Sequence, residues 1–218
     1  TIPSVRDLLG FLNIDEKDFI KETDATYKLG IGFKDWDRIG GFYWHPFGDI
    51  GPLVENTSLY LHWLQQSVKG AKLPELQDLA ICSVACSENR FAMPDRNHNV
   101  KNWLSYAYHF DAGKFADYLK GYGKAKGVNH IIGNIVDSTL DNEGFINEII
   151  LEDGRKIKGD FFIDCSGFAA LLVEKKLGSK YEDWRQYLPV DSAYAVQSKN
   201  TKPMNPYTLS TAREAGWT

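Results

Sequence analysis

Lys28 is the residue whose surroundings in the sequence point most directly to chemistry. Between residues 25 and 34, apolar side chains alternate with small or polar ones, which predicts a β-strand that carries Lys28 on the face opposite the apolar residues. Its neighbours on that face include Gly30 and Gly32, and a glycine inside a strand often marks the close approach of a ligand or of another backbone. A lysine removed from water in this way can act as a nucleophile or as a hydrogen-bond donor. The alternative is an exposed or edge-strand lysine that prevents unwanted strand pairing.

A histidine within an aromatic segment is the second candidate. His45, Pro46, Phe47 and Gly48 come directly after the aromatic run 42–44. A planar substrate could stack on these rings, because aromatic pairs contribute about 0.5 to 1.5 kcal/mol beyond the burial of area. His45 could serve as an acid or a base near neutral pH. The alternative for this segment is a hydrophobic plug that covers the core.

The third candidate is a turn of small residues. The apolar run 161–163 leads through an aspartate into Cys165, Ser166 and Gly167, and residues 169–177 have the pattern of a helix. A strand, a small-residue turn and a helix form ligand sites in α/β sheets, because backbone N–H groups are free at the helix start. The alternative is a helix cap with no further role.

The elements that would position these residues are helices and strands in mixture. Helices are expected after Ser4, after the pair at 56–57 and after Asp111, which has the side chain of a helix N-cap. Strands are expected at 25–34, 128–136 and 161–165. A hairpin over 145–158 turns at Asp153-Gly154, and 39–52 forms a loop or hairpin. The predicted fold class is α/β, a mixed sheet with helices.

Composition favours small-molecule chemistry. The 218 residues are 43% hydrophobic and 25% charged, with a formal net charge of -4 and no long run of one sign. The sequence therefore indicates neither disorder nor nucleic-acid binding nor a polybasic membrane surface. No apolar stretch approaches the ~20 residues that span a bilayer. Three cysteines are too few for a disulfide framework and lack zinc-site spacing, which indicates reduced thiols and a cytoplasmic protein.

Several stretches of the sequence resemble the flavin-dependent tryptophan halogenase family. They occur in the family's order and cover the chain from end to end. The matching stretches are Thr1-Ile2-Pro3-Ser4, Ala25-Thr26-Tyr27-Lys28-Leu29-Gly30-Ile31, His45-Pro46-Phe47-Gly48, Tyr108-His109-Phe110-Asp111-Ala112, Phe162-Ile163-Asp164-Cys165-Ser166-Gly167 and Gly216-Trp217-Thr218.

The resemblance implies an FAD-dependent monooxygenase-like fold and the halogenation of an electron-rich aromatic compound such as tryptophan or indole. Reduced FAD (FADH2) from a separate flavin reductase, oxygen and a halide ion would give hypohalous acid. By the same resemblance, Lys28 receives or hydrogen-bonds this oxidant and presents it to one carbon of the ring. The implied enzyme needs no metal, nucleic acid or membrane, and it allows a homodimer.

The resemblance also assigns binding residues. The substrate pocket would be lined by His45, Pro46, Phe47 and Gly48, with the Phe47 ring stacked on the substrate. The FAD would lie near Cys165, Ser166 and Gly167, and its adenine half would be reached from the predicted strand 128–136 by Ile135.

The sequence departs from the family's pattern at both ends. The glycine-rich turn that binds the FAD pyrophosphate, which precedes the Thr1 segment in the family, is absent from the sequence. Trp217 resembles the first tryptophan of the family's W-x-W-x-I-P signature, and the glutamate that partners the lysine comes after that signature. We therefore expect residues 1–218 to form the central part of a single FAD-dependent halogenase domain, an incomplete fold that is inactive alone.

Two other functions stay open on the sequence. A flavin-dependent aromatic hydroxylase has the same fold and would hydroxylate the ring instead of halogenating it. A non-catalytic, truncated flavoprotein module is the other alternative.

Overall fold

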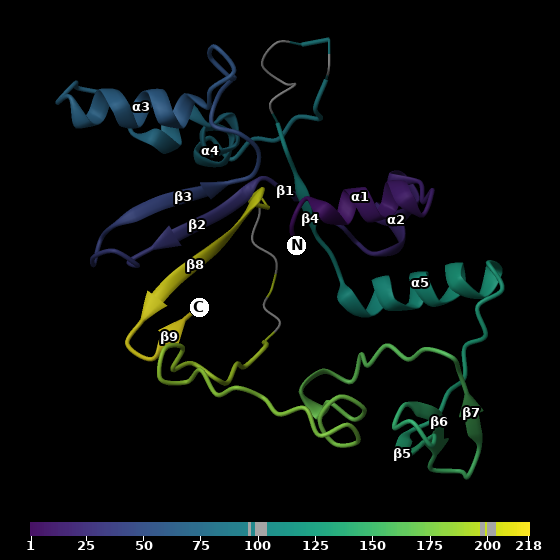
Figure 1. The fold of residues 1–218 in the computed structure, drawn as a ribbon. Helices are drawn as coiled ribbons and strands as arrows, with labels where there is room; N and C mark the ends of the chain where they lie inside the picture. The colour runs from purple at the N-terminus through teal and green to yellow at the C-terminus, as the bar shows by residue number, and fades with distance from the viewer. Residues whose placement is uncertain (96, 99–103, 197–198, 200–203) are drawn as a thin grey trace. The chain divides into compact units, whose positions relative to one another are not determined.

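A computed structural model describes residues 1–95, 97–98, 104–196, 199 and 204–218. The chain divides into two compact units, which are described separately below (Figure 1). The first unit is formed by Thr1–Gly123 together with Tyr194–Thr218, and the second by Lys124–Ala193.

Two short helices open the first unit. They are α1 (Ser4–Phe11) and α2 (Glu16–Glu22). The carboxylate of Asp15 caps α2 by accepting the backbone N–H groups of Lys17 and Asp18 at 2.8 and 3.1 Å, as expected of an N-cap aspartate. The helix predicted after Ser4 is confirmed, but its cap is Pro3, which makes no side-chain hydrogen bond there. Ser4 is the first helical residue instead of the cap.

The strand predicted over 25–34 is two strands in two different sheets. β1 (Thr26–Lys28) and β2 (Gly30–Lys34) are separated by Leu29, which is fully buried. The N–H of Leu29 donates to the Pro206 carbonyl at 2.7 Å, and its carbonyl accepts the N–H of Phe47 at 2.8 Å. Both backbone hydrogen bonds of Leu29 thus go to segments of the second sheet, so strand pairing passes from one sheet to the other at this residue. The strand prediction is confirmed for 26–28 and 30–34 and is interrupted at Leu29.

Among the described strands, β1 pairs only with β4 (Ala107–His109), and the pair is antiparallel. β2 lies in a four-stranded sheet of order β3-β2-β8-β9, formed with β3 (Phe42–Pro46), β8 (Tyr207–Arg213) and β9 (Gly216–Trp217). β2 and β3 form an antiparallel hairpin over 30–46, so the segment 39–52, predicted as a loop or hairpin, supplies only its second strand and part of its loop, whereas β2 and β8 are parallel. This topology brings the start of β8 beside the start of β2, close in sequence to Lys28 (Figure 1).

Aromatic residues fill the core of the first unit. Phe19 of α2 is fully buried, and its ring meets those of Tyr108, Phe110 and Phe115 edge to face at centroid distances of 4.9, 5.6 and 5.3 Å. Edge-to-face packing of this kind is favoured by the ring quadrupoles. Both β4 and the segment that follows it are therefore held against α2.

Four further helical elements belong to the first unit, namely α3 (Leu59–Val68), the 3-10 helix η1 (Leu76–Leu79), α4 (Ile81–Ser87) and α5 (Ala112–Ala125). The helix predicted after 56–57 is α3, capped by Ser58. The helix predicted after Asp111 is α5, and the Asp111 carboxylate accepts the N–H of Lys114 at 3.0 Å. Both of these helix predictions are confirmed.

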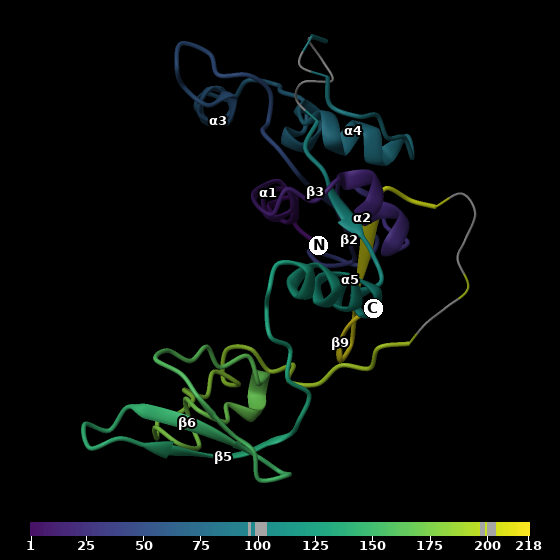
Figure 2. The same cartoon turned by 90° about the vertical axis from the view of Figure 1, so that its right-hand side faces the viewer.

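The second unit contains one small antiparallel sheet. Its strands are β5 (Ile135–Leu140), β6 (Ile146–Leu151) and β7 (Lys156–Lys158), in that order, and β5 and β6 lie side by side in Figure 2. The predicted hairpin over 145–158 is confirmed, with Gly154 at φ 85° in its turn. The strand predicted over 128–136 is wrong for 128–134, because pairing with β6 begins only at Ile135.

The predicted strand 161–165 and helix 169–177 are also wrong. Residues 161–165 have no strand assignment, and a 3-10 helix, η3 (Gly167–Ala169), and turns occupy the region of the helix. Phe161 and Ile163 are 82% and 78% exposed. A strand needs a hydrogen-bonded neighbour, and none of the described residues supplies one to this segment.

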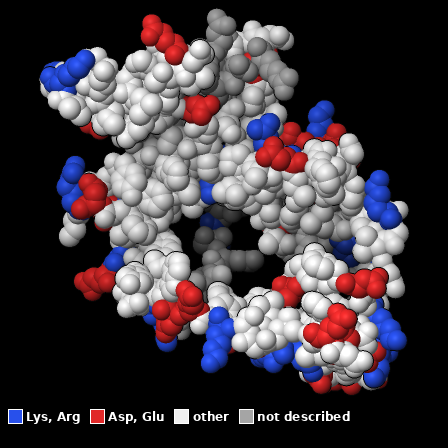
Figure 3. Space-filling view, in the orientation of Figure 1, with Lys and Arg blue, Asp and Glu red and all other residues white. Residues whose placement is uncertain are grey.

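The described surface carries both signs of charge. On the face drawn in Figure 3, basic and acidic groups alternate with uncharged ones, and neither sign gathers into one continuous area. Among the described residues, no helix is long and apolar enough to cross a membrane.

Candidate active site

Lys28 is a buried lysine. It is the last residue of β1 and is only 6% exposed. Lys28 is therefore not the exposed lysine of the alternative interpretation, which would prevent unwanted strand pairing. None of the ion pairs found among the described residues involves Lys28. Loss of water on burial lowers the pKa of its amine below the ordinary lysine value. An amine with these properties is suited to hold a reactive group in place.

Phe47 is the aromatic residue that the structure brings to Lys28. The Lys28 Nζ lies 5.7 Å from the centroid of the Phe47 ring, within the range of a cation–π contact. The hydrogen bond from the Phe47 N–H to the Leu29 carbonyl fixes this neighbourhood through the backbone. The lysine and the aromatic residue that the sequence predicted therefore lie next to each other.

The other residues of the His-Pro-Phe-Gly segment are less enclosed. His45 is exposed, and its ring stacks on Phe33 at a centroid distance of 6.4 Å. Pro46 lies opposite Gly30 in the β2–β3 ladder, and Gly48 is exposed with φ of 79°. The structure thus places His45, Pro46 and Gly48 around Phe47. None of the contacts found among the described residues joins these three residues to Lys28.

The two glycines near Lys28 do not border an open space. A Cβ on Gly30 would lie 2.7 Å from the His45 carbonyl oxygen, and one on Gly32 would lie 2.8 Å from the tip of the Phe42 ring. Gly30 therefore marks the close approach of another backbone, one of the two possibilities that the sequence left open. Because the strand is interrupted at Leu29, these glycines lie in β2 and Lys28 lies in β1.

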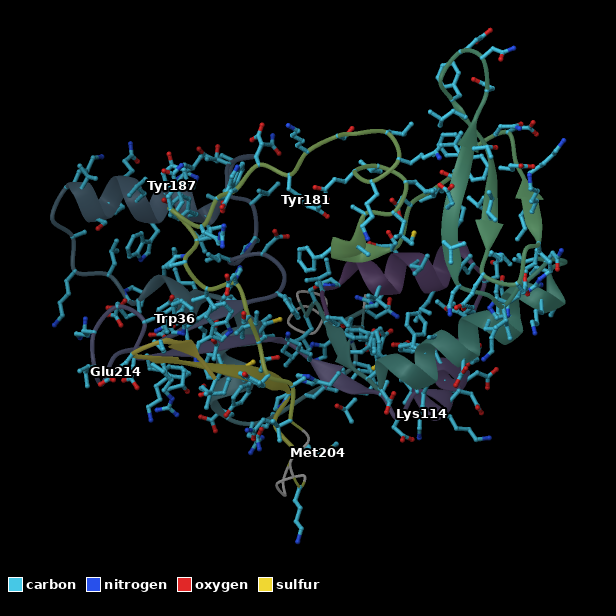
Figure 4. All side chains as sticks on the ribbon, turned by 90° about the horizontal axis from the view of Figure 1, so that it is seen from below. Trp36, Lys114, Tyr181, Tyr187, Met204 and Glu214 are labelled. Carbon is cyan, nitrogen blue, oxygen red and sulfur yellow. The ribbon has the colours of Figure 1, made fainter. Side chains whose placement is uncertain are left out.

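His109 is a residue of this region to which sequence reasoning gave no role. It pairs with Thr26 across the β1–β4 ladder, and both line an open cavity of about 420 Å³ with Asp24, Asn205 and Tyr207. Met204, labelled in Figure 4 beside the start of β8, lines the same cavity. The one available signal was its place in the matching stretch Tyr108-His109-Phe110-Asp111.

Burial determines the charge state of His109. Its pKa is lowered to about 4, first because burial disfavours the cation and then because the positive charge of Lys28 lies near it. The imidazole is therefore neutral at physiological pH.

The residues predicted to contact FAD lie in the second unit. Ser166 donates its N–H and its Oγ–H to Asp164 Oδ1 at 3.0 and 2.6 Å. Asp164 Oδ2 also accepts the N–H groups of Leu172 and Val173 at 2.8 and 3.1 Å. These donors hold the pKa of Asp164 well below its usual range, the Ser166 hydroxyl contributing most. Asp164 therefore organises the turn, which the sequence had assigned to small residues alone.

This turn fits a bound FAD in part. Cys165 is exposed, and a Cβ on Gly167, where φ is 64°, would meet nothing within 4 Å, so the backbone here is open to a ligand. The hydrogen-bonding groups of Ser166 are instead engaged with Asp164 and with the N–H of Leu171. Ile135 lines a separate small cavity of about 80 Å³ between β5 and residues 171–176.

The profile of the tryptophan halogenase family matches residues 1–218. This chain belongs to the tryptophan halogenase family. Among the halogenases that it resembles, 7-chloro-L-tryptophan 6-halogenase KtzR of Kutzneria sp. (strain 744) is 32% identical over 238 residues. Tryptophan 6-halogenase SttH of Streptomyces toxytricini is 31% identical over 241 residues. These alignments cover 100% of this chain and 46% and 45% of the relatives, so the halogenase-family chain spans a little under half of their length.

Solved halogenase structures have the same fold as this chain. The flavin-dependent halogenase BrvH from Brevundimonas sp. BAL3 superposes with a TM-score of 0.88 at 38% identity. Xcc4156, a flavin-dependent halogenase from Xanthomonas campestris, superposes with a TM-score of 0.86 at 34% identity. Each match covers 100% of this chain and 45% or 43% of the other. The predicted mixed α/β halogenase fold is thereby confirmed over part of the length of these enzymes.

Proposed function

We propose that this chain is part of an FADH2-dependent halogenase that acts on an electron-rich aromatic compound of the tryptophan or indole type, and that Lys28 presents hypohalous acid to the ring. The observation that carries the proposal is the position of Lys28. The residue is 6% exposed, and its amine is unpaired with any carboxylate of the described residues and lies 5.7 Å from the centroid of the Phe47 ring.

The family supports this choice of substrate and cofactor. KtzR and SttH are tryptophan or chlorotryptophan halogenases by name, and BrvH and Xcc4156 are flavin-dependent. When bound, reduced FAD supplies the oxidising chemistry that turns halide and oxygen into hypohalous acid. Cys165, Ser166, Gly167 and Ile135 would hold the FAD, a separate reductase would deliver it reduced, and a cytoplasmic location and a homodimer are compatible with this scheme.

Lys28 would contribute position rather than oxidising power. Its amine donates a hydrogen bond to the oxygen of the oxidant, and the buried stem restricts where the halogen can point. An oxidant free in solution would attack any accessible electron-rich carbon, whereas a held one reaches a single carbon. Phe47 would stack on the substrate ring, and His45, Pro46 and Gly48 would complete the wall around it.

The decisive experiment uses the protein expressed from its complete reading frame, with a flavin reductase, halide and an indole substrate. We expect Lys28→Ala to lower ring halogenation by at least on the order of 100-fold, because the reacting group loses its fixed position. Hypohalous acid formation, measured with a small electron-rich trap, should persist. Lys34→Ala is the matched control, since Lys34 is an exposed lysine of the neighbouring strand. Unchanged product yield in Lys28→Ala would exclude Lys28 as the presenting group.

The same assay distinguishes the proposed activity from its alternatives. With bromide in the buffer, mass spectrometry of the product detects bromine only if the enzyme halogenates. A hydroxylated product would instead identify an aromatic hydroxylase. A protein without flavin absorbance and without turnover would be the non-catalytic module.

A further inference from the structure

His109 and Lys28 project from the same face of the two-stranded β1–β4 ribbon. The antiparallel register pairs Thr26 with His109 and Lys28 with Ala107, and directly paired residues point to the same side of a ladder. His109 is thus the diagonal neighbour of Lys28, at a typical Cβ separation of about 7 to 8 Å that a long side chain can bridge. Ala107, fully buried, contributes only a methyl group between them.

One nitrogen of His109 has no partner. The Nε2 atom is buried and forms no hydrogen bond with any residue that the structure describes, although other atoms of the side chain line the cavity next to Thr26. An unsatisfied buried polar atom destabilises the folded state, so it calls for an explanation. The titratable and charged side chains around the ring are Lys28 of β1, Asp24 before β1 and Tyr207 of β8.

We propose that His109 is a positioning residue for Lys28: its unused Nε2 accepts an N–H of the Lys28 amine when that amine turns to present its ligand. This inference rests on the proposed function of Lys28. Nε2 is an acceptor when the imidazole proton is on Nδ1. The Lys28 amine has three donors on a flexible stem, so that one N–H can bind Nε2 while another binds the oxidant.

Histidine suits this role better than a carboxylate within the ribbon. A carboxylate beside Lys28 would form an ion pair that neutralises the amine and holds it tightly. A neutral imidazole accepts a hydrogen bond without such an ion pair. No proton moves to His109 in this scheme, since the imidazole is a far weaker base than the amine.

The test compares His109→Leu with His109→Gln in the protein expressed from its complete reading frame. Leucine removes the acceptor at similar volume, whereas the glutamine side chain can return a carbonyl oxygen near the place of Nε2. Ser83→Ala is the control, because Ser83 also carries a buried, unpartnered polar atom of the first unit but lies on α4. Activity is measured as kcat and KM for the aromatic substrate, with product formed per FADH2 consumed.

We expect His109→Leu to lower kcat and product per FADH2 about tenfold with KM unchanged, His109→Gln to recover part of the loss, and Ser83→Ala to match the wild type. In a Lys28→Ala background, His109→Leu should have no further effect, because residues that act as one unit are non-additive. Wild-type kcat in a folded His109→Leu protein, or an equal loss in the Lys28→Ala background, would overturn the proposal.

A second measurement does not depend on halogenation. Acetylation of Lys28 by an amine-reactive reagent, followed by mass spectrometry over a range of pH, reports how much of the amine is deprotonated. Loss of an acceptor for the ammonium lowers the lysine pKa, so His109→Leu should acetylate at lower pH than the wild type and His109→Gln should lie between them. Identical curves for all three proteins would refute the contact, even if the enzyme proved not to be a halogenase.

Discussion

The amine of Lys28 lies 5.7 Å from the centre of the Phe47 ring, and one backbone hydrogen bond maintains this relationship. Leu29, the neighbour of Lys28, accepts the N–H of Phe47 at 2.8 Å. The strand that ends in Lys28 and the aromatic segment that follows β3 are therefore joined at adjacent residues. A substitution of Lys28 or of Phe47 therefore changes the same region of the structure.

Phe47→Ala should weaken binding of the aromatic substrate. Loss of a stacking partner worth about 0.5 to 1.5 kcal/mol corresponds to a KM increase of up to about tenfold. Phe47→Tyr, which keeps the ring, should leave KM near the wild-type value. Phe11→Ala serves as the control for a lost phenylalanine, because Phe11 is 83% exposed on α1. Steady-state kinetics on the complete protein provide the measurement, and an unchanged KM in Phe47→Ala would mean that this ring does not contact the substrate.

Gly30→Ala should destabilise the first unit by about 1 to 3 kcal/mol, the usual range for overpacking. The added Cβ would lie 2.7 Å from the His45 carbonyl oxygen and 3.0 Å from the Pro46 Cα, and neither backbone atom can move without breaking the β2–β3 ladder.

Gly32→Ala is the comparison for this prediction, since its Cβ would meet only the tips of the Phe42 and Trp44 rings, at 2.8 and 3.0 Å. Side-chain tips can shift, so the loss in thermal unfolding midpoint should be smaller than for Gly30→Ala. An equal decrease in the unfolding midpoint of the two variants would show that the β3 backbone can shift to make room for the added Cβ.

Leu29 shows how far the sequence pattern predicts this fold. Alternation of apolar and polar residues correctly predicted strand structure on both sides of it, because that signal is local. It could not predict the change of sheet at Leu29, where the backbone hydrogen bonds go to Pro206 and Phe47. The hairpin at Gly154 and the helix cap at Asp111 were predicted correctly for the complementary reason, since both are set by residues within a few positions.

Non-local pairing explains the remaining differences. The apolar run 161–165 has strand composition, but strand structure requires a neighbour that the run itself cannot supply. His109 received no role from the sequence, because its position beside Lys28 follows from the register of β1 with β4 and from nothing within its own segment. Alternation marked Lys28 and the aromatic segment marked Phe47 as candidates, and the family resemblance added the roles that the local pattern alone does not contain.

Glu16→Ala should lower the stability of the first unit more than any exposed carboxylate change in α2. The hydroxyl groups of Tyr106 and Tyr108 both donate to Glu16 Oε1 at 2.7 Å, and both tyrosines are almost fully buried. Removing the shared acceptor leaves two buried donors, each at a cost of about 1 to 3 kcal/mol.

Glu16→Gln keeps a carbonyl oxygen and should be milder than Glu16→Ala. Glu22→Ala, an exposed glutamate of the same helix, should change the unfolding midpoint little. Chemical denaturation followed by tyrosine and tryptophan fluorescence measures all three. A Glu16→Ala protein as stable as Glu22→Ala would show that water replaces the lost acceptor.

Tyr106 should make the protein sensitive to alkali in a defined range of pH. Burial, and then its hydrogen bond to Glu16, raise the pKa of its phenol from 10.0 to about 12. The neutral phenol is favoured in the folded state, so its contribution to stability is complete below pH 10.0 and is lost as pH rises through about 12. We expect the free energy of unfolding to fall less steeply over this range in Tyr106→Phe than in the wild type. Denaturation with urea at several pH values tests this prediction. Tyr187→Phe is the control, because Tyr187 is exposed. If the free energy of unfolding fell equally steeply with pH in Tyr106→Phe and in the wild type, the pKa of the Tyr106 phenol would be the same in the folded and unfolded states.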